Sequence, residues 1–320
     1  MQPRPDHTAS EPRADGRERS GARPRAYAQR LAGAPISWGA CEVPGWGRMP
    51  DPETVLTEMA ALGLRGTELG APGFLPDDPA EVVEMLRRHG LGCVGGFIAL
   101  VLHESEFDVP ATRRALELLA GAGGEMAVVA VVQDPDWSPP RPLSDAGWQN
   151  LAANARAVQS LAGEYGLTFA LHSHVGTLIE TDEQLQHALE VTDVGWCLDT
   201  GHLMIGGTDP AAFAAEHGDR VTHVHLKDID AALAADLMAG RLSLLTATQR
   251  GLFVPLGQGA APVAQTLHAL DEHGYDGWLV LEQDTAITAD EPAVNSASML
   301  AARESIEFLN SAHTTEEINR

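Results

Sequence analysis

Four short apolar runs in the second half of the chain each lead into a side chain that can bind a metal ion. These side chains are His172, Asp199, His225 and Glu282. Imidazole nitrogen and carboxylate oxygen together suit Mn²⁺ or Co²⁺, with Zn²⁺ and Fe²⁺ as alternatives, whereas Mg²⁺ and Ca²⁺ prefer oxygen alone. No cysteine stands at the end of these runs, so we expect an open catalytic site and not a closed structural zinc site.

Further histidines stand beside these positions. His174 follows His172 by two residues, and because side-chain direction alternates along a strand, either imidazole could face the site. His202 follows Asp199 by three residues, in the adjoining loop. Any one of these residues is more often a hydrogen-bonded core histidine or a solvated cap than a ligand. Four neighbouring runs that all end in metal-competent side chains are hard to obtain from packing alone, so the pattern indicates a metal site.

The elements that must position these residues follow a repeated pattern of short apolar runs and longer amphipathic segments, which is typical of a parallel sheet. Strands are expected at 33–38, 66–69, 91–97, 126–133, 167–172, 194–198, 221–225 and 278–282. Helices are expected at 52–62, 79–89, 110–120, 146–165, 182–191, 210–217, 261–273 and 295–309. The pattern predicts an α/β fold, a single TIM (β/α)8 barrel over residues 29–310, with its chemistry at the carboxyl ends of the strands.

Three segments lie outside this alternation. Residues 1–28 are rich in Arg, Pro and Gly and lack the apolar core of a secretory signal, which predicts a disordered tail, and residues 311–320 are predicted to be a polar C-terminal tail. The excursion from Ile229 to Gly259 is expected to form a lid or rim. Within it, 256–259 is interpreted as a turn, because no Lys-Ser or Lys-Thr follows its glycines as in a phosphate loop.

The composition limits the partners and the location of the protein. A net charge of −24, with 45 acidic and 21 basic residues, opposes binding to a nucleic-acid backbone. No run of 18 apolar residues is present that could span a bilayer, so no membrane partner is expected. The three cysteines Cys41, Cys93 and Cys197 are odd in number and widely spaced, so disulfides are not expected and the cytoplasm is the expected location.

Several motifs resemble the sugar phosphate isomerase/epimerase superfamily, also called the xylose isomerase-like TIM barrels. The matching stretches are APISWG at 34–39, GTELG at 66–70, HSHVGT at 172–177, LDTGH at 198–202, HVHLKD at 223–228 and GWLVLEQD at 277–284. Asp-Thr-Gly-His and His-Val-His-Leu-Lys-Asp are specific to the superfamily as a pair. The His-x-His-x-Gly-Thr segment points more narrowly to the inosose dehydratase branch. The resemblance spans about residues 33–290.

The resemblance implies a ligand set. Members of the superfamily typically bind their metal through a glutamate that ends the fifth strand, then an aspartate, a histidine and a final glutamate. The last three match Asp199, His225 and Glu282. The fifth strand departs from the pattern, because His172 stands where the glutamate is expected, as in the inosose dehydratase branch. His174 is the alternative fourth ligand.

This departure bears on the reaction. The epimerases of the superfamily use two metal-bound glutamates on opposite faces of the substrate, and one of the pair is missing here. An elimination needs one base beside a ketone, an electrophile and an acid for the β-hydroxyl. Glu282 or a histidine is the expected base, and His202 or Lys227 would orient hydroxyls or protonate the leaving oxygen. The residues expected to line the substrate pocket with them are Trp38, Glu68 and His174.

Some of these roles have structural alternatives. Lys227 could form a surface ion pair with Asp228, Glu68 could cap a loop, and Trp38 could belong to the core. Sequence reasoning alone leaves these alternatives open.

The predicted function is a metal-dependent lyase that dehydrates a keto-cyclitol such as 2-keto-myo-inositol. The alternatives among enzymes are a metal-dependent keto-sugar isomerase or epimerase and a lyase that acts on an oxidised glycoside. An apurinic-site endonuclease shares the barrel and the Asp-x-x-His pattern but needs a basic face, which the net charge of −24 opposes. The near-complete ligand set disfavours a non-catalytic sugar-binding protein. Barrels of this kind often pair, which by analogy favours a homo-oligomer.

Overall fold

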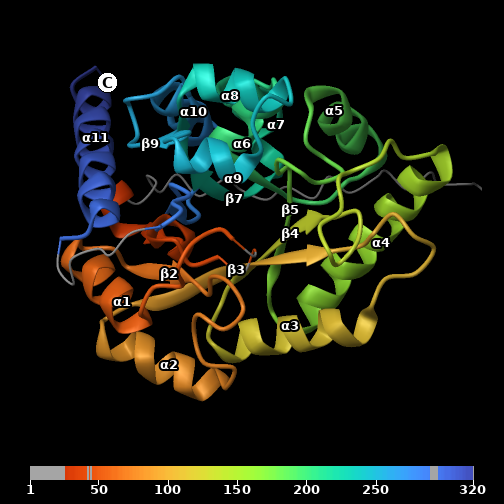
Figure 1. Ribbon diagram of the computed structural model, residues 1–320, viewed down its shortest axis with the longest axis horizontal. Helices are drawn as coiled ribbons and strands as arrows, with labels where there is room; N and C mark the ends of the chain where they lie inside the picture. Colours follow the sequence, from red (N-terminus) through yellow and green to blue (C-terminus); the bar gives the residue numbers. More distant parts are fainter. Residues whose placement is uncertain (1–25, 42, 44, 289–294, 320) are drawn as a thin grey trace, which may run out of the picture.

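A computed structural model describes residues 26–41, 43, 45–288 and 295–319. Within them, parallel strands close into a barrel in the order β1-β10-β7-β6-β5-β4-β3-β2, which confirms the predicted fold (Figure 1). The barrel strands are β1 Leu31–Gly33, β2 Gly66–Glu68, β3 Gly92–Leu100, β4 Met126–Val131, β5 Thr168–His172, β6 Trp196–Asp199, β7 Val221–Leu226 and β10 Leu279–Leu281. Their buried side chains form the core of the barrel.

Helices surround the barrel strands (Figure 1). They are α1 Pro52–Ala61, α2 Pro79–Arg88, α3 Val109–Gly121, α4 Asp145–Glu164, α5 Asp182–Val191, α6 Thr200–Gly206, α7 Pro210–His217, α10 Val263–Glu272 and α11 Ala297–Asn319. Many begin after a polar side chain that accepts hydrogen bonds from the first backbone N–H groups, as Asp51 does for α1 and Asp209 for α7. Proline follows each of these two caps, where its missing N–H costs nothing.

The first strand differs from the prediction of 33–38. β1 ends at Gly33 and is followed by a 3-10 helix, η2, over Pro35–Trp38. Pro35 has no N–H for a strand ladder and its φ is fixed near the helical value, so the chain turns there. A short 3-10 helix, η1, over Tyr27–Gln29 precedes β1, with Tyr27 buried. The expected tail over 1–28 otherwise lies outside the described residues.

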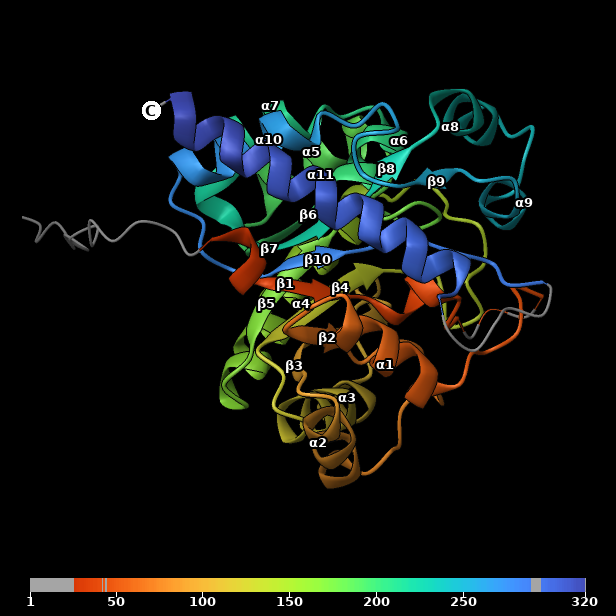
Figure 2. The same cartoon turned by 90° about the vertical axis from the view of Figure 1, so that its left-hand side faces the viewer.

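The excursion after β7 forms a small unit with its own core. It contains β8 Asp228–Ile229, α8 Ala231–Met238, α9 Leu244–Gln249 and β9 Phe253–Val254, with β8 and β9 paired antiparallel. Figure 2 shows α8 and α9 together at one corner of the molecule. Its buried apolar residues pack with two from outside the excursion, Val175 and Ile205. The excursion is therefore attached to the loop after β5 and to α6.

The C-terminal helix α11 lies across the outside of the barrel near β1 and β10 (Figure 2). It continues to Asn319, beyond the predicted end at 309 and through the expected polar tail. Residues 310–319 contain no glycine or proline that would end a helix. Glu58 holds the start of this segment, because its carboxylate accepts the backbone N–H of Ser296 at 2.9 Å.

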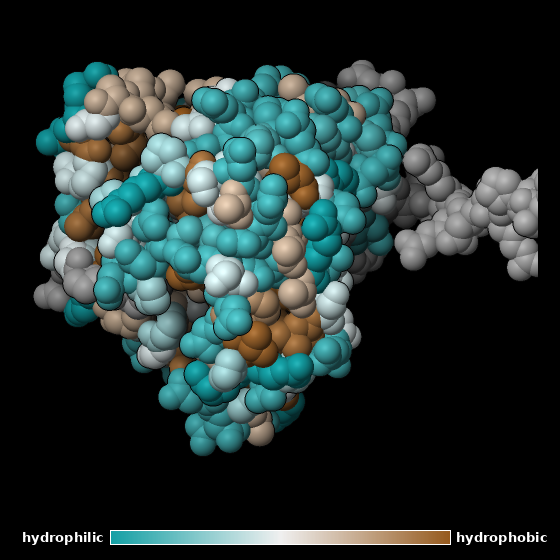
Figure 3. All heavy atoms as spheres, turned by 90° about the vertical axis from the view of Figure 1, so that its right-hand side faces the viewer, coloured by the Kyte–Doolittle hydropathy of each residue, from teal (hydrophilic) through white to brown (hydrophobic). Residues whose placement is uncertain are grey.

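The surface is polar over the face drawn in Figure 3. That face is largely hydrophilic, with apolar residues in scattered patches. Among the described residues, no helix has both the length and the apolar character needed to cross a membrane.

Candidate metal centre and active site

Four side chains from neighbouring strands converge at one end of the barrel. His172 ends β5, Asp199 ends β6, His225 lies near the end of β7, and Glu282 directly follows β10. One ligand atom of each lies within 4.8 Å of the others. Asp199 Oδ2 lies 3.7 Å from His172 Nε2 and 3.6 Å from His225 Nδ1, and Glu282 Oε2 lies 2.9 Å from His225 Nδ1. The structure therefore brings together the four residues predicted as ligands.

These separations fit a shared divalent ion. Two ligands that each lie about 2.1 Å from one ion are about 3.0 to 3.4 Å apart in octahedral or tetrahedral geometry. Asp199 Oδ2 and His225 Nδ1 are buried and make no hydrogen bond. A buried carboxylate oxygen without a hydrogen bond is costly, and a metal cation between these atoms would lower that cost further than the Lys227 ammonium does from 3.6 Å. The donor set of two imidazoles and two carboxylates suits a borderline divalent ion.

Hydrogen bonds fix which nitrogen of each imidazole can bind an ion. His172 Nδ1 lies 2.6 Å from the carbonyl oxygen of Ser173 and donates to it, which leaves the Nε2 lone pair facing Asp199. His225 Nε2 lies 3.0 Å from Glu68 Oε1 and donates to it, so Nδ1, which faces Asp199 and Glu282, is the nitrogen that can bind an ion. Burial would lower the pKa of His225, but Cys197 and the surrounding carboxylates raise it well above its usual range, so an ion would replace a proton on Nδ1. His172 Nε2 and His225 Nδ1 therefore face the same space. A carboxylate behind a ligating histidine is a common arrangement in metal sites.

Glu68 lies beside His225 in the barrel interior and is only 3% exposed. The same Oε1 atom also accepts from His223 Nε2 at 2.9 Å. Burial alone would raise the pKa of Glu68, but the two imidazoles lower it to about 2. The pairing of β2 with β3 shifts between Thr67 and Glu68, an irregularity of the kind that re-aims a side chain at a strand end. Glu68 was predicted to line the substrate pocket, and in the structure it contacts the candidate ligand His225.

Lys227 is buried among the candidate ligands and is 1% exposed. Its ammonium Nζ lies 2.9 Å from Asp284 Oδ1, 3.2 Å from Glu282 Oε2 and 3.6 Å from Asp199 Oδ2. It also donates to His202 Nε2 at 3.0 Å. Burial would lower the pKa of Lys227, but the carboxylates raise it above its usual range. The lysine therefore stays charged, and it is not part of a surface ion pair.

Asp284 was not among the predicted site residues. Burial raises its pKa to about 6, although the contact with Lys227 opposes that shift. Its position two residues after Glu282 on the same chain segment is the signal that could have identified it, because alternate side chains face the same side.

Asp228 has a structural role next to Lys227. Its two carboxylate oxygens accept the backbone N–H groups of Ile229, Gly257, Gly259 and Ala261 at 2.8 to 3.0 Å. A Cβ atom on Gly259 would collide with Asp228 Oδ1, so glycine is required there. This carboxylate fastens the turn at 256–259 to the end of β7.

Aromatic rings line the region beside the ligands. The ring of His174 lies 3.9 Å from His202, 5.7 Å from Phe97 and 6.2 Å from Trp137, measured between centroids. Trp137 has a φ of 55°, a left-handed conformation that is strained for a residue other than glycine. Such outliers often occur at functional sites, but nothing in the sequence around Trp137 predicted it. The His174 imidazole lies beside the group that contains His172 and is not a member of it.

The excursion contributes to the same region. The Lys227 ammonium lies 4.9 Å from the ring centroid of Phe253 in β9, and the Phe253 ring lies 6.2 Å from His202. The excursion, which was predicted to form a lid or rim, therefore places an aromatic ring beside Lys227. Trp38 is buried, and its Nε1 donates to Glu58 Oε2 at 2.8 Å, while its ring lines a small cavity together with Glu282.

Comparison with known proteins places the chain in a family. An inosose dehydratase of Geobacillus kaustophilus (strain HTA426) is 30% identical over 275 residues, which cover 81% of this chain and 89% of that protein. The rhizopine catabolism protein MocC of Rhizobium meliloti is 32% identical over 267 residues, which cover 80% of this chain and 81% of that protein. Among solved structures, the IolI protein with a bound zinc atom superposes with a TM-score of 0.66 at 16% identity, covering 88% of this chain and 97% of that one. Residues 56–312 match the model of the xylose isomerase-like TIM barrel, and the chain belongs to that family.

Proposed function

We propose that this chain is a metal-dependent lyase that removes water from a keto-cyclitol, with 2-keto-myo-inositol as its substrate. The observation that carries the proposal is the imidazole of His172 at the end of β5. It leaves Glu282 as the one glutamate in the four-residue group formed by the described residues. Proton exchange between two faces of a sugar needs two bases, whereas elimination needs one. The relatives named inosose dehydratase support the same reaction.

The proposed ligands are His172 Nε2, Asp199 Oδ2, His225 Nδ1 and Glu282 Oε2, with Mn²⁺ or Co²⁺ as the ion. When bound, a divalent ion polarises the ketone of the substrate and stabilises negative charge on its oxygen. The hydrogen bonds described above support this assignment, because they leave His172 Nε2 and His225 Nδ1 facing Asp199.

Glu282 is the proposed base. Burial would raise its pKa, but His225 and Lys227 hold that pKa below its usual range, so the carboxylate is ionised at neutral pH. It accepts the proton from the carbon next to the ketone, the carbon–oxygen bond to the β-hydroxyl breaks, and a carbon–carbon double bond forms. The proton then passes to the departing hydroxyl, which leaves as water, and the enol product is a tautomer of a dione.

Lys227 and His202 are proposed to orient the substrate and not to supply this proton. The raised pKa of Lys227 makes it a poor acid. Burial, the neighbouring imidazoles and the Lys227 ammonium hold the pKa of His202 well below its usual range, and its Nε2 accepts from that ammonium. His174 donates through Nδ1 to the carbonyl oxygen of Val175, so its Nε2 can accept a hydrogen bond from a substrate hydroxyl.

The test is turnover of 2-keto-myo-inositol by the protein loaded with Mn²⁺ or Co²⁺, followed by the absorbance of the enolised dione. Glu282→Gln should abolish the signal. Glu58→Gln is the matched control, because Glu58 is also buried but bonds to Trp38 and Ser296, and it should retain turnover in folded protein. Turnover of a keto-hexose by the wild-type protein, with no dione formed, would replace the lyase by an epimerase.

A further inference from the structure

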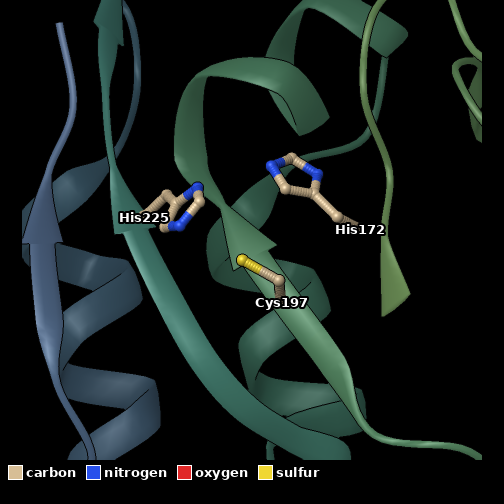
Figure 4. A group of neighbouring side chains, drawn as sticks. All are labelled: His172, Cys197 and His225. Carbon is tan, nitrogen blue, oxygen red and sulfur yellow. The ribbon is translucent and has the colours of Figure 1, made fainter. Parts of the chain in front are cut away.

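A buried thiol lies deeper in the barrel than the carboxylates of the candidate metal centre. Cys197 precedes Asp199 by two residues in β6, so both side chains face the barrel interior and the cysteine lies further from the mouth. Figure 4 shows its sulfur next to the space between the imidazoles of His172 and His225. Cys197 Sγ and one nitrogen of each imidazole lie within 4.8 Å of one another. Cys197 is only 2% exposed.

The two imidazoles therefore belong to two donor groups. One group adds the carboxylates of Asp199 and Glu282, and the other adds the thiol of Cys197. Carboxylate oxygen is a hard donor, whereas thiolate sulfur is a soft donor that favours thiophilic ions. His172 Nδ1 and His225 Nε2 already bond to Ser173 and Glu68, so His172 Nε2 and His225 Nδ1 are the nitrogens that can bind an ion in either group.

We propose that His172, Cys197 and His225 form a second metal position for a thiophilic divalent ion such as Cd²⁺, one that shares both imidazoles with the carboxylate position. Binding there breaks the S–H bond of Cys197 and the N–H bond at His225 Nδ1, forms bonds from sulfur and nitrogen to the metal, and releases both protons to the solvent. Because both positions use His172 Nε2 and His225 Nδ1, two ions cannot occupy them with all their ligands at the same time. A thiophilic ion therefore displaces the ion that serves the proposed lyase activity, so this inference rests on the proposed metal role of the two histidines.

The test uses Cd²⁺ alone as the probe and the ultraviolet sulfur-to-cadmium charge-transfer band as the readout. All proteins are full length, free of added metal, and carry Cys41→Ser, so that this partly exposed thiol does not contribute. The background protein should show the band, and Cys197→Ala and Cys197→Ser should lose it. Cys93→Ala is the matched control, because Cys93 is also a buried thiol in a barrel strand but belongs to neither group, and it should keep the band.

The two metal positions also differ in affinity. Cys197→Ala should weaken Cd²⁺ binding about tenfold or more and leave Mn²⁺ affinity within about threefold, because Mn²⁺ gains little from sulfur. If the alanine variant does not fold, as judged by circular dichroism, the near-isosteric serine variant decides the result.

Three results would overturn the inference: no Cd²⁺ binding to the background protein, Cd²⁺ binding without the band, or a band that persists in both Cys197 variants. Failure of the proposed function gives a different pattern. In that case no dione forms with any ion, while the cadmium band and its dependence on Cys197 are still observed.

Discussion

Glu68→Ala is the change that tests how the metal centre is held in place. Glu68 Oε1 accepts from His225 Nε2 at 3.0 Å and from His223 Nε2 at 2.9 Å. Without that carboxylate, the proton of His225 is no longer held on Nε2 and the ring is no longer fixed with Nδ1 toward Asp199. We therefore propose that Glu68 is a positioning residue for the ligand His225.

The magnitude follows from these contacts. Loss of a hydrogen-bond partner behind a metal-binding histidine typically weakens metal binding about 10- to 100-fold, or about 1.4 to 2.8 kcal/mol. The two imidazole N–H groups are also left buried without an acceptor, at about 1 to 3 kcal/mol each. Glu68→Ala should therefore bind Mn²⁺ about 10- to 100-fold more weakly and be less stable in the absence of metal. Glu68→Gln should fall between the wild-type protein and Glu68→Ala, because its amide oxygen can take the place of Oε1 but carries no charge, and hydrogen bonds to a neutral acceptor are weaker.

The assay is a competition between the protein and a chelator of known Mn²⁺ affinity, with urea unfolding of the same metal-free samples. Glu58→Gln separates stability from positioning. It removes a buried carboxylate that contacts Trp38 and Ser296, so it should lower stability without changing Mn²⁺ affinity. Wild-type Mn²⁺ affinity in folded Glu68→Ala would refute the positioning role.

Three further predictions concern pH and the excursion. The pKa of Glu68 is about 2 in the folded protein against an ordinary value of 4.5. Its ionised form therefore contributes about 3 kcal/mol of stability above pH 4.5, and this contribution is lost as the pH falls toward 2. Urea unfolding of metal-free Glu68→Gln across that range should lack this pH-dependent component. Asp228→Asn replaces one accepting oxygen by an N–H donor, so it should destabilise the turn at 256–259 by about 3 kcal/mol. Proteolysis within 231–256 should then be faster, and an unchanged cleavage rate would contradict the proposed role of Asp228 in holding this turn. Phe253→Ala should raise KM several-fold more than it changes kcat, because the ring covers Lys227 without touching a candidate ligand. An unchanged KM would argue against the excursion as a lid over the substrate.

Much of the fold could be predicted from periodicity. The bounds of α5 at 182–191 and α7 at 210–217 agree with the structure, because polar caps and a proline mark where these helices start. The first strand was predicted too late in the chain, at 33–38, because Pro35 cannot continue the hydrogen bonds of a strand and instead starts a 3-10 helix. The elements within the excursion were missed, because α8, α9 and the short β8–β9 pair are stabilised by packing on Val175 and Ile205 from elsewhere in the chain.

The site could be predicted only where a residue ends a strand. His172, Asp199, His225 and Glu282 follow apolar runs, and the barrel brings such positions together. The roles of neighbouring residues depend on tertiary contacts that no local pattern encodes. Glu68 turns inward at a register shift between β2 and β3, and this cannot be read from the motif that contains it.

We propose that a divalent ion is required for dehydration of a keto-cyclitol and that it is held by His172, Asp199, His225 and Glu282. The most direct measurement compares dione formation from 2-keto-myo-inositol by metal-stripped protein, by the same protein after addition of Mn²⁺ or Co²⁺, and by Asp199→Ala treated in the same way. We expect no turnover in the stripped protein, recovery on addition of the ion, and neither metal binding nor recovery in Asp199→Ala, whose missing Oδ2 faces both imidazoles. Full turnover in the presence of chelator, or full metal content in folded Asp199→Ala, would contradict the claim.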